Sequence, residues 1–383
     1  MAAGLLPGCE KYSSVKIIDE NFMKALIERG IDKDNDGTIS FSEAAEVKEL
    51  NVYRCNIFDM TGIEWFINLE TLRCGYNDFT ELDVSQNKAL EYLDIAHNKV
   101  SALDVSKNIN LEALITMYNP LSSLDLSKNS ALTYLNTEAN QIINLDISNN
   151  VLLKEVNCWG NGLIKLDVSK NTALERLNCN GNKLVTLDLS HNSALKTLQC
   201  QYNEITSLDL TNNPGLTGLN CADNKLSSID IDGCEILDGL FCWANELTVL
   251  DISNKPFLNR LNCERNQITS LDLSADTSLW ELKCQVNKLS DLDITTCKSL
   301  KRLDCYDNHL TSLNTSNNPE LEYLSCGYNQ IITLDISGNT RIGFLGIDHM
   351  PSLTMVCVWV TPFPSMLWTE GSPNYYFTTD CSK

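Results

Sequence analysis

Residues 174–194 read LERLNCNGNKLVTLDLSHNSA, and this stretch decides the fold. It follows the pattern L-x-x-L-x-C-x-x-N-x-L-x-x-L-D-L-S-x-N-x-x, which returns every 21 residues. The central asparagine of the unit recurs thirteen times without an insertion, at Asn77, Asn98, Asn119, Asn140, Asn161, Asn182, Asn203, Asn224, Asn245, Asn266, Asn287, Asn308 and Asn329. A fixed period of this length predicts a solenoid of stacked units.

Each unit has two halves with different patterns. The first half, L-x-x-L-x-C, alternates apolar and variable residues, which is typical of a strand with one buried face. The second half, L-D-x-S-x-N, is rich in turn formers and has no helical period, so we expect an extended or tightly turned return path. Because one unit cannot bury its apolar edge alone, neighbouring units must stack. The predicted fold is mainly β, with a helix-loop-helix cap at the N-terminus and a short β cap at the C-terminus.

These residues are those of leucine-rich repeats, and the 21-residue form with cysteine at its sixth position resembles the bacterial internalins. The resemblance extends from about Leu50 to Ile347. It implies a curved solenoid on a bacterial surface, with its parallel sheet on the concave face. It also implies that this face binds host proteins or other ligands and that the protein is not an enzyme.

The sixth position of the unit forms a column of ten cysteines: Cys74, Cys158, Cys179, Cys200, Cys221, Cys242, Cys263, Cys284, Cys305 and Cys326. Because they share a face with the leucines, we expect buried, reduced thiols that pack as small hydrophobes. Neighbouring cysteines would lie about 4.8 Å apart with parallel Cβ bonds, which does not suit a disulfide. A straight column also offers too few converging ligands for zinc, and no base for a catalytic thiolate.

Four other cysteines replace or follow the repeat. Cys234 and Cys297 each stand where the unit has its second asparagine, and we expect them to be tolerated substitutions. Cys357 and Cys381 lie in the divergent C-terminal segment. They would pair in an oxidising compartment and stay reduced in a reducing one, and their spacing leaves both alternatives open.

The segment 32–43 reads DKDNDGTISFSE and fits the loop of an EF-hand at every diagnostic position. Gly37 would make the sharp turn, an apolar helical stripe precedes the loop, and a second helix should run from Ser42 to about Leu50. The alternative is an acidic loop without metal. Because the chain has a single such loop, we expect one structural Ca²⁺ ion that stabilises the cap, with ligands from Asp32, Asp34, Asp36, Thr38, Ser40 and Glu43.

We divide the chain into a signal or linker remnant at 1–14, an EF-hand-like cap at 15–50, the solenoid at 51–347 and a C-terminal cap at 348–383. Cys9 follows Leu-Pro-Gly, which resembles the lipobox of bacterial lipoproteins, so Cys9 would carry lipid. No basic residue precedes it and the apolar stretch is short, so a truncated start is the alternative. In the C-terminal cap, the aromatic residues Trp359, Phe363 and Trp368 should pack over the last coil.

Residues that flank the buried leucine and cysteine of each strand should point outward. Exposed aromatic and arginine side chains are typical of interface centres, and tryptophan faces also suit sugar rings. The alternative is that stacked aromatic rings only shield the sheet. The candidate ligand-binding residues are Tyr118, Trp159, Tyr202, Phe241, Trp243, Arg260, Arg265, Trp280 and Tyr306.

Aspartate follows the fourth leucine of nearly every unit, from Asp83 to Asp335, with Asn314 as the exception. We expect each aspartate to accept hydrogen bonds from nearby backbone or serine groups. These twelve residues supply more than half of the net charge of -21, which therefore says little about partners beyond disfavouring nucleic acid.

Together these features predict a secreted or surface-anchored bacterial binding protein, adhesin-like, that recognises an extracellular protein or a glycan. We expect a monomer that contacts a membrane, such as the bacterial outer membrane, only through lipid on Cys9. The four histidines are scattered and no nucleophile, acid pair or phosphate loop accompanies them, so we expect no enzyme activity. The alternative function is a structural spacer at the cell surface without a specific ligand.

Overall fold

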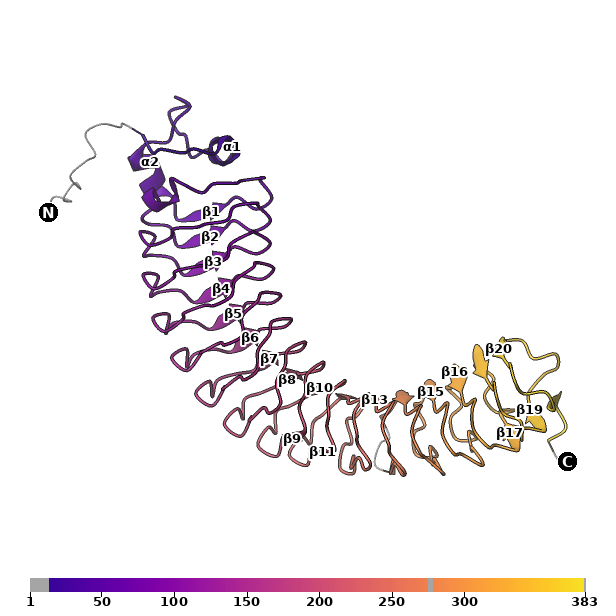
Figure 1. The fold of residues 1–383 in the computed structure, drawn as a ribbon. Helices are drawn as coiled ribbons and strands as arrows, with labels where there is room; N and C mark the ends of the chain where they lie inside the picture. The colour runs from indigo at the N-terminus through magenta and orange to yellow at the C-terminus, as the bar shows by residue number, and fades with distance from the viewer. Residues whose placement is uncertain (1–13, 275–277, 382–383) are drawn as a thin grey trace. The chain divides into compact units, whose positions relative to one another are not determined.

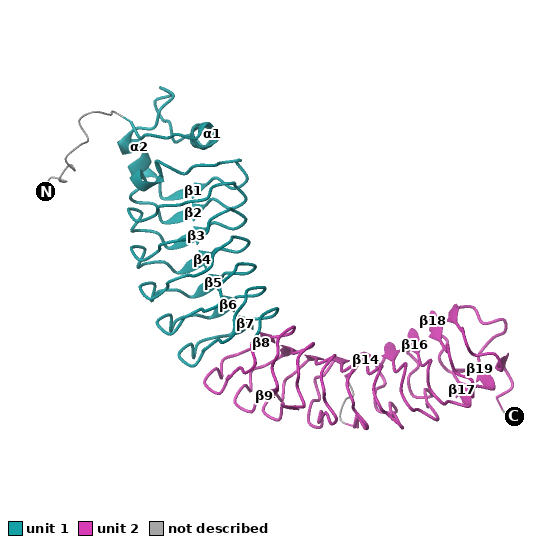
Figure 2. Cartoon of the chain, viewed as in Figure 1, with its two compact units in different colours: residues 1–183 teal, residues 184–383 magenta. Residues whose placement is uncertain are grey.

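The structure is a computed structural model that describes residues 14–274 and 278–381. Cys9 lies outside the described residues, so its lipidation stays a prediction. The chain divides into two compact units, Met1–Lys183 and Leu184–Lys383 (Figure 2). Each unit is a stack of coils in which one strand per coil joins a parallel sheet (Figure 1).

Unit 1 begins with the N-terminal cap and continues into the first coils. Its helices are α1 (Glu20–Glu28), α2 (Phe41–Glu46) and the short 3₁₀ helix η2 (Ile63–Trp65). Its sheet contains seven parallel strands, which are β1 (Glu49–Asn51), β2 (Thr71–Arg73), β3 (Tyr92–Asp94), β4 (Ala113–Ile115), β5 (Tyr134–Asn136), β6 (Glu155–Asn157) and β7 (Arg176–Asn178).

Unit 2 has a main parallel sheet and short strands on the return path. The main sheet contains β8 (Thr197–Gln199), β10 (Gly218–Asn220), β12 (Gly239–Phe241), β13 (Arg260–Asn262), β14 (Glu281–Lys283), β15 (Arg302–Asp304), β16 (Tyr323–Ser325), β18 (Phe344–Gly346) and β20 (Met366–Trp368). The return path carries β9 (Ser207–Asp209) paired with β11 (Ser228–Asp230), and a second sheet of β17 (Thr333–Asp335), β19 (Met355–Cys357) and β21 (Tyr376–Thr378).

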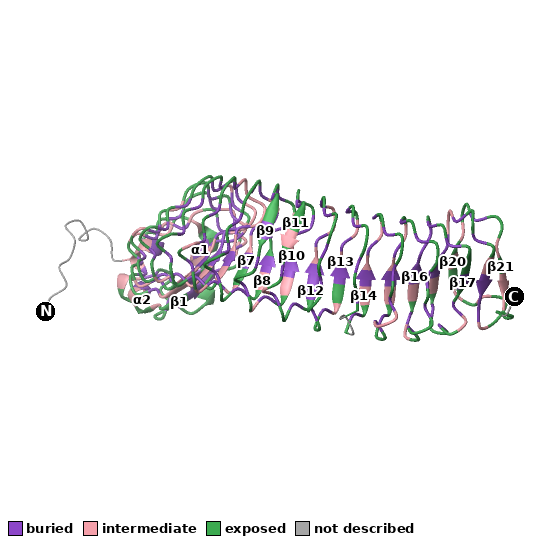
Figure 3. Ribbon diagram, turned by 90° about the horizontal axis from the view of Figure 1, so that it is seen from below, coloured by how far each residue is buried: buried purple, intermediate pink, exposed green. Residues whose placement is uncertain are grey.

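The register of the strands follows the repeat. Within unit 1, for example, Leu93 of β3 pairs with Leu114 of β4, which is 21 residues later. The central residue of each strand in the two main sheets points into the core, except that Leu367 of β20 is only half-buried (Figure 3). No described residue after Trp65 is helical, so the predicted solenoid with an extended or turned return path is confirmed.

The repeated asparagine closes the bend that follows each strand. The Asn182 amide donates to the carbonyl oxygens of Cys158, Cys179 and Asn180 at 3.0–3.1 Å, and its Oδ1 accepts from the Leu163 N–H at 3.0 Å. One side chain therefore satisfies backbone groups of its own coil and of the preceding coil, where no water reaches them.

The ten column cysteines are buried and none of them is in a disulfide. Burial raises the pKa of the Cys158, Cys263 and Cys326 thiols to about 12. The predicted column of reduced thiols is therefore confirmed. Cys234 is buried as well, and its thiol faces the carbonyl oxygens of Leu210 and Asn213 at 3.6 and 3.7 Å, the groups that an asparagine amide would bind.

Three details of the two caps differ from the prediction. Helix α2 ends at Glu46 instead of about Leu50, because Leu50 is buried at the centre of β1 and pairs with Leu72. The C-terminal cap contains three strands, β19, β20 and β21, and is therefore larger than the short β cap that we expected. Trp368 was expected to pack over the last coil but is 61% exposed, because it lies on β20, the last strand of the main sheet.

Cys357 and Cys381 form a disulfide that joins β19 to the end of the described chain. This pairing selects the first of the two alternatives that the sequence left open. None of the helices in the part of the chain that the structure describes is long and apolar enough to span a membrane.

Replacing Asn182 by alanine should lower the free energy of unfolding by roughly 2–5 kcal/mol, because several buried backbone groups lose their partner. Urea denaturation measures this change. Asn144→Ala is the control, since Asn144 is exposed on the return path, and it should change stability by less than about 0.5 kcal/mol. Equal effects of the two substitutions would contradict the role of the asparagine column.

The buried thiols should make the fold sensitive to alkali. Unfolded thiols lose their protons above about pH 8.5, whereas the folded thiols stay protonated, so stability present below that pH is lost as the pH rises towards the folded pKa. At pH 10 each column thiol should lower the free energy of unfolding by about 1–2 kcal/mol relative to neutral pH. We expect Cys263→Ala to show a smaller loss between pH 7 and pH 10 than the unchanged protein, and an equal loss would argue against buried thiols.

Candidate ligand-binding surface and metal loop

The exposed side of each main sheet, here called the sheet face, is formed by the residues that alternate with the buried ones. In β12, Gly239 and Phe241 lie on the sheet face on either side of the buried Leu240. Trp243 follows on the same side, after the buried Cys242. The predicted arrangement, with thiols inward and aromatic side chains outward, is therefore present.

In unit 1 the aromatic side chains at the ends of the strands stack on one another. The ring centroids of Tyr76 and His97 are 3.9 Å apart and those of His97 and Tyr118 are 4.3 Å apart, both in stacked geometry. Tyr53 continues the stack at 4.9 Å from Tyr76, and Trp159 meets Tyr118 edge-on at 6.5 Å. The candidates Tyr118 and Trp159 thus belong to one aromatic cluster.

Unit 2 brings together two pairs of the candidate residues. Tyr202, which is 50% exposed, meets Trp243 edge-on with ring centroids 5.8 Å apart. The Arg260 guanidinium carbon lies 5.5 Å from the centroid of the Phe241 ring, which is within the range of a cation–π contact. These four residues lie on or directly after strands β8, β12 and β13.

The remaining candidates are not part of these pairs. Trp280 directly precedes β14, whereas Trp243 and Arg265 follow their strands, so Trp280 lies at the opposite end of a strand from them. Arg265 is exposed at the left-handed turn position, with φ 52°. Tyr306 contacts Tyr328 at 4.9 Å instead of another candidate.

The prediction overlooked an aromatic row in unit 2 on the strands after β14. Tyr323 and Phe344 stack with centroids 4.4 Å apart, Trp368 meets Phe344 edge-on at 5.2 Å, and Arg302 covers the other side at 3.7 Å from the Tyr323 centroid. Arg302, Tyr323 and Phe344 occupy the first position of their strands. That position flanks the buried leucine and could have been read from the sequence in the same way as for Arg260.

Two aspartates on the sheet faces are partly buried. Desolvation raises the pKa of Asp94 in unit 1, and burial likewise raises the pKa of Asp304 in unit 2. The Oδ1 atom of Asp304 is buried without a hydrogen-bond partner among the described residues. Hydrogen bonds from Tyr306 and Ser325 and the charge of Arg302 act against the burial of Asp304, whereas the Glu264 carboxylate raises its pKa further.

The predicted calcium loop brings three of its carboxylates together. One carboxylate oxygen from each of Asp32, Asp34 and Asp36 lies within 4.8 Å of the other two. Gly37 adopts a φ of +83°, which only glycine adopts readily, and this turn brings its N–H to Asp32 Oδ2 at 3.0 Å. Three converging carboxylates around one turn form the kind of oxygen donor set that Ca²⁺ prefers.

Glu43 closes the same loop from α2. Its carboxylate accepts from the backbone N–H groups of Ser40 and Lys33 and from the Ser40 hydroxyl, at 2.6–2.8 Å. These hydrogen bonds lower the pKa of Glu43 to about 2, so the side chain is ionised. The Ser40 hydroxyl also caps α2 by accepting from the Glu43 N–H at 3.2 Å. The residues present therefore fit a calcium site.

The cap is fastened to the first coil by side chains next to the loop. Asp19 caps α1 through the Phe22 N–H and also accepts from the Phe58 and Asp59 N–H groups at 2.6 and 3.1 Å. On the other helix, Phe41 packs against Trp65 with ring centroids 4.5 Å apart. Fixing the angle between α1 and α2 therefore also fixes how the cap covers the solenoid.

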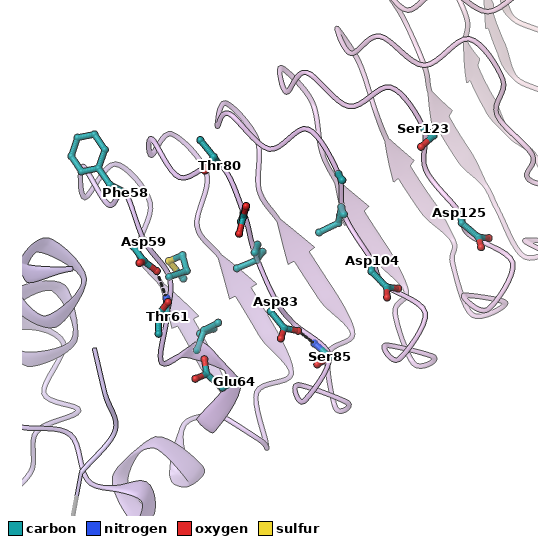
Figure 4. Close-up of a pocket in the computed structure, with 16 residues that line it drawn as sticks. Phe58, Asp59, Thr61, Glu64, Thr80, Asp83, Ser85, Asp104, Ser123 and Asp125 are labelled. Carbon is teal, nitrogen blue, oxygen red and sulfur yellow. Dashed lines mark hydrogen bonds between the residues drawn. The ribbon is translucent and has the colours of Figure 1, made fainter. Parts of the chain in front are cut away.

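The repeated aspartates have the local role predicted for them. All twelve accept a hydrogen bond from the backbone N–H two residues later, as Asp83 does from Ser85 at 2.9 Å. In unit 1, Figure 4 shows Asp83, Asp104 and Asp125 on successive turns of a groove of about 750 Å³. These carboxylates belong to the turns of the repeat and do not converge on a common point.

The chain shares its fold with several proteins of known structure. No protein-family model matches the chain, and no curated protein matches it either. Among solved structures, the chain is similar to a plant peptide hormone receptor, RGFR1 in complex with RGF2, with a TM-score of 0.67, 19% identity, 77% of this chain and 53% of that chain covered. This likeness shows the fold alone.

Two internalin structures from Listeria monocytogenes are also similar. The internalin InlF matches with a TM-score of 0.68 and 22% identity, covering 85% of this chain and 94% of that chain. The functional domain of InlJ, which includes a cysteine ladder, matches with a TM-score of 0.79 and 36% identity, covering 84% of this chain and 75% of that chain. The shared cysteine column and this level of identity show that the chain belongs to the internalin-type leucine-rich repeat proteins.

Proposed function

We propose that this protein is a binding protein that engages an extracellular protein through the sheet face of its solenoid. The observation that carries the proposal is the set of aromatic and arginine side chains held outward on a rigid parallel sheet. Such side chains form the energetic centres of protein interfaces because they bury a large area at low conformational cost. A sheet that only needed to be soluble would not expose them.

The ring geometry favours a protein partner over a glycan in unit 1. A sugar binds an aromatic side chain by lying on its face. The rings of Tyr76, His97 and Tyr118 already cover one another's faces at 3.9–4.3 Å and offer mainly their edges and hydroxyl groups. A glycan remains the second candidate ligand for unit 2, where Tyr202 and Trp243 meet edge-on and leave ring faces uncovered.

The same family membership supports a proposal about export. We propose that the protein is secreted or held at a bacterial surface, and that lipid on Cys9 supplies the attachment. The disulfide between Cys357 and Cys381 supports an oxidising compartment, because cytosolic thiols are kept reduced. Binding without catalysis is the proposed activity.

We propose further that one Ca²⁺ ion stabilises the N-terminal cap. Asp32, Asp34, Asp36 and Glu43 would bind it through their carboxylates, the Thr38 carbonyl would be a further ligand, and Ser40 would bind directly or through water. The fastening of α1 and α2 to the first coil gives the ion a structural role. The cap in turn covers the apolar end of the solenoid, which would otherwise be open to association.

Replacing Trp159 and Trp243 by alanine should weaken binding of the ligand about tenfold or more, because aromatic anchors dominate interface energies. An array of extracellular proteins and glycans identifies the ligand, and titration measures its affinity. Phe257→Ala is the matched control, since Phe257 is 57% exposed but lies on the return path. Unchanged binding by the tryptophan variants would remove the proposed site, and an array without any saturable ligand would favour the structural spacer.

Removing calcium should lower the melting temperature of the protein, because an ion bound only by the folded state stabilises that state by about 2.7 kcal/mol at one hundred times its dissociation constant. Thermal melts with calcium and with a chelator measure the shift. Glu43→Gln should abolish the difference between the two melts. Glu28→Gln removes the same charge from α1, outside the loop, and should leave the difference intact. If the chelator does not change the melting temperature of the unchanged protein, the calcium site is contradicted.

A further inference from the structure

Arg260 differs in its surroundings from Arg176 and Arg302, the two arginines that also occupy the first position of their strands. Arg176 lies 3.2 Å from Glu155 and Arg302 lies 3.6 Å from Glu281, so both have a carboxylate partner. No described carboxylate lies within 4.0 Å of the Arg260 guanidinium, although the protein carries a net charge of -21. A positive group without an ion pair in such an acidic molecule is available to a ligand.

The carboxylate that could pair with Arg260 is already engaged. Glu281 lies opposite Arg260 in the register of β13 and β14. Its Oε1 atom is 3.3 Å from Lys283 Nζ and 3.6 Å from Arg302 Nε, and both contacts draw it away from Arg260. On the other neighbouring strand, the residue opposite Arg260 is Gly239, which has no side chain.

Gly239 leaves open space beside the Arg260 guanidinium. A Cβ atom at Gly239 would be 3.9 Å from Arg260 Nη2 and 3.4 Å from Phe241 Cε2, so both side chains lean over this glycine. The guanidinium is thereby placed beside the Phe241 ring at 5.5 Å. A guanidinium that is held by a ring keeps its N–H donors free for a planar, bidentate acceptor such as a carboxylate.

The surroundings of Arg260 define what must accompany that carboxylate. The strand on the far side of Gly239 is β10, which presents Gly218 opposite Gly239. Trp243, after β12, and Tyr202, after β8 on the other side of β10, provide apolar ring surface. Arg265 adds a second exposed guanidinium after β13 that has no described carboxylate within 4.0 Å.

We propose that Arg260, Phe241 and Trp243 form a docking surface for an acidic segment of a protein partner. An aspartate or glutamate of that segment pairs with the Arg260 guanidinium, and an apolar side chain next to it packs on Phe241 and Trp243. This inference rests on the proposed function and adds the chemical class of the partner. The favoured partner bears negative charge although the protein itself is acidic, so Arg260 selects it locally.

The test is a selection of phage-displayed random twelve-residue peptides on the immobilised full chain. We expect the enriched peptides to carry aspartate or glutamate next to an aromatic or aliphatic residue. Their binding should fall at least about tenfold in Arg260→Gln and in Phe241→Ala, and it should weaken with rising salt because the ion pair is exposed. Arg341→Gln is the matched control, since Arg341 pairs with Glu320 away from these strands, and it should bind like the unchanged protein.

The possible outcomes separate this inference from the proposed function. Enriched peptides that are neutral or basic, or that bind Arg260→Gln as well as the unchanged protein, would overturn the acidic partner class. If such peptides still lose binding in Trp243→Ala, the sheet face remains a protein-binding surface. No enrichment above the unselected library would overturn both. Circular dichroism of Arg260→Gln should match the unchanged protein, because the exposed arginine supports no core contact.

Discussion

The fold depends on satisfying the backbone groups that each coil buries where its strand ends. A solenoid repeats the same bend in every coil, so an unpaired N–H or C=O at that bend would be repeated as well, at a cost of about 1–3 kcal/mol each. One asparagine per unit removes that cost by bonding its own coil and the preceding one. The insertion-free period of 21 residues follows, because only one register brings each amide to the carbonyls of the neighbouring coil.

The thiol column and the sheet face are consequences of this register. Once the coils are in register, the sixth residue of each unit lies above the sixth residue of the preceding unit, in a space of fixed size between leucines. Cysteine fits there as a small hydrophobe, and its raised pKa keeps it protonated in that dry environment. The same alternation places the intervening residues outside, so an arginine or tryptophan at those positions reaches solvent without disturbing the core.

Much of this architecture could be predicted because it repeats. The strands, the buried thiols, the asparagine bonds and the turn aspartates each recur many times, and one correct reading of residues 174–194 extends to all coils. The ends repeat nothing, which is why α2 was expected to continue to Leu50 although the pairing of β1 with β2 ends the helix. Trp368 was misjudged for the same reason, because the sequence after Asn339 forms two further coils without keeping the repeat pattern.

The candidate site was only partly predictable. Reading the outward positions around the buried leucine and cysteine found Tyr202 and Trp243, which the structure places in contact. The same reading could not show that the Arg260 side chain approaches Gly239 on the adjacent strand. It also could not show that Glu281 forms ion pairs with Lys283 and Arg302. The convergence of Asp32, Asp34 and Asp36 could be read from the sequence because they alternate along one short loop, whereas calcium binding stays a prediction.

Amide hydrogen exchange tests the central role of the asparagine column most directly. The N–H groups of Ile142, Leu163, Leu226 and Ile268 donate to an asparagine of the next coil instead of a backbone carbonyl. If the column holds the coils in register, these amides should exchange as slowly as those of the strands. Exchange as fast as that of exposed turn amides would show that the coils are held by apolar stacking alone and that the asparagines are incidental.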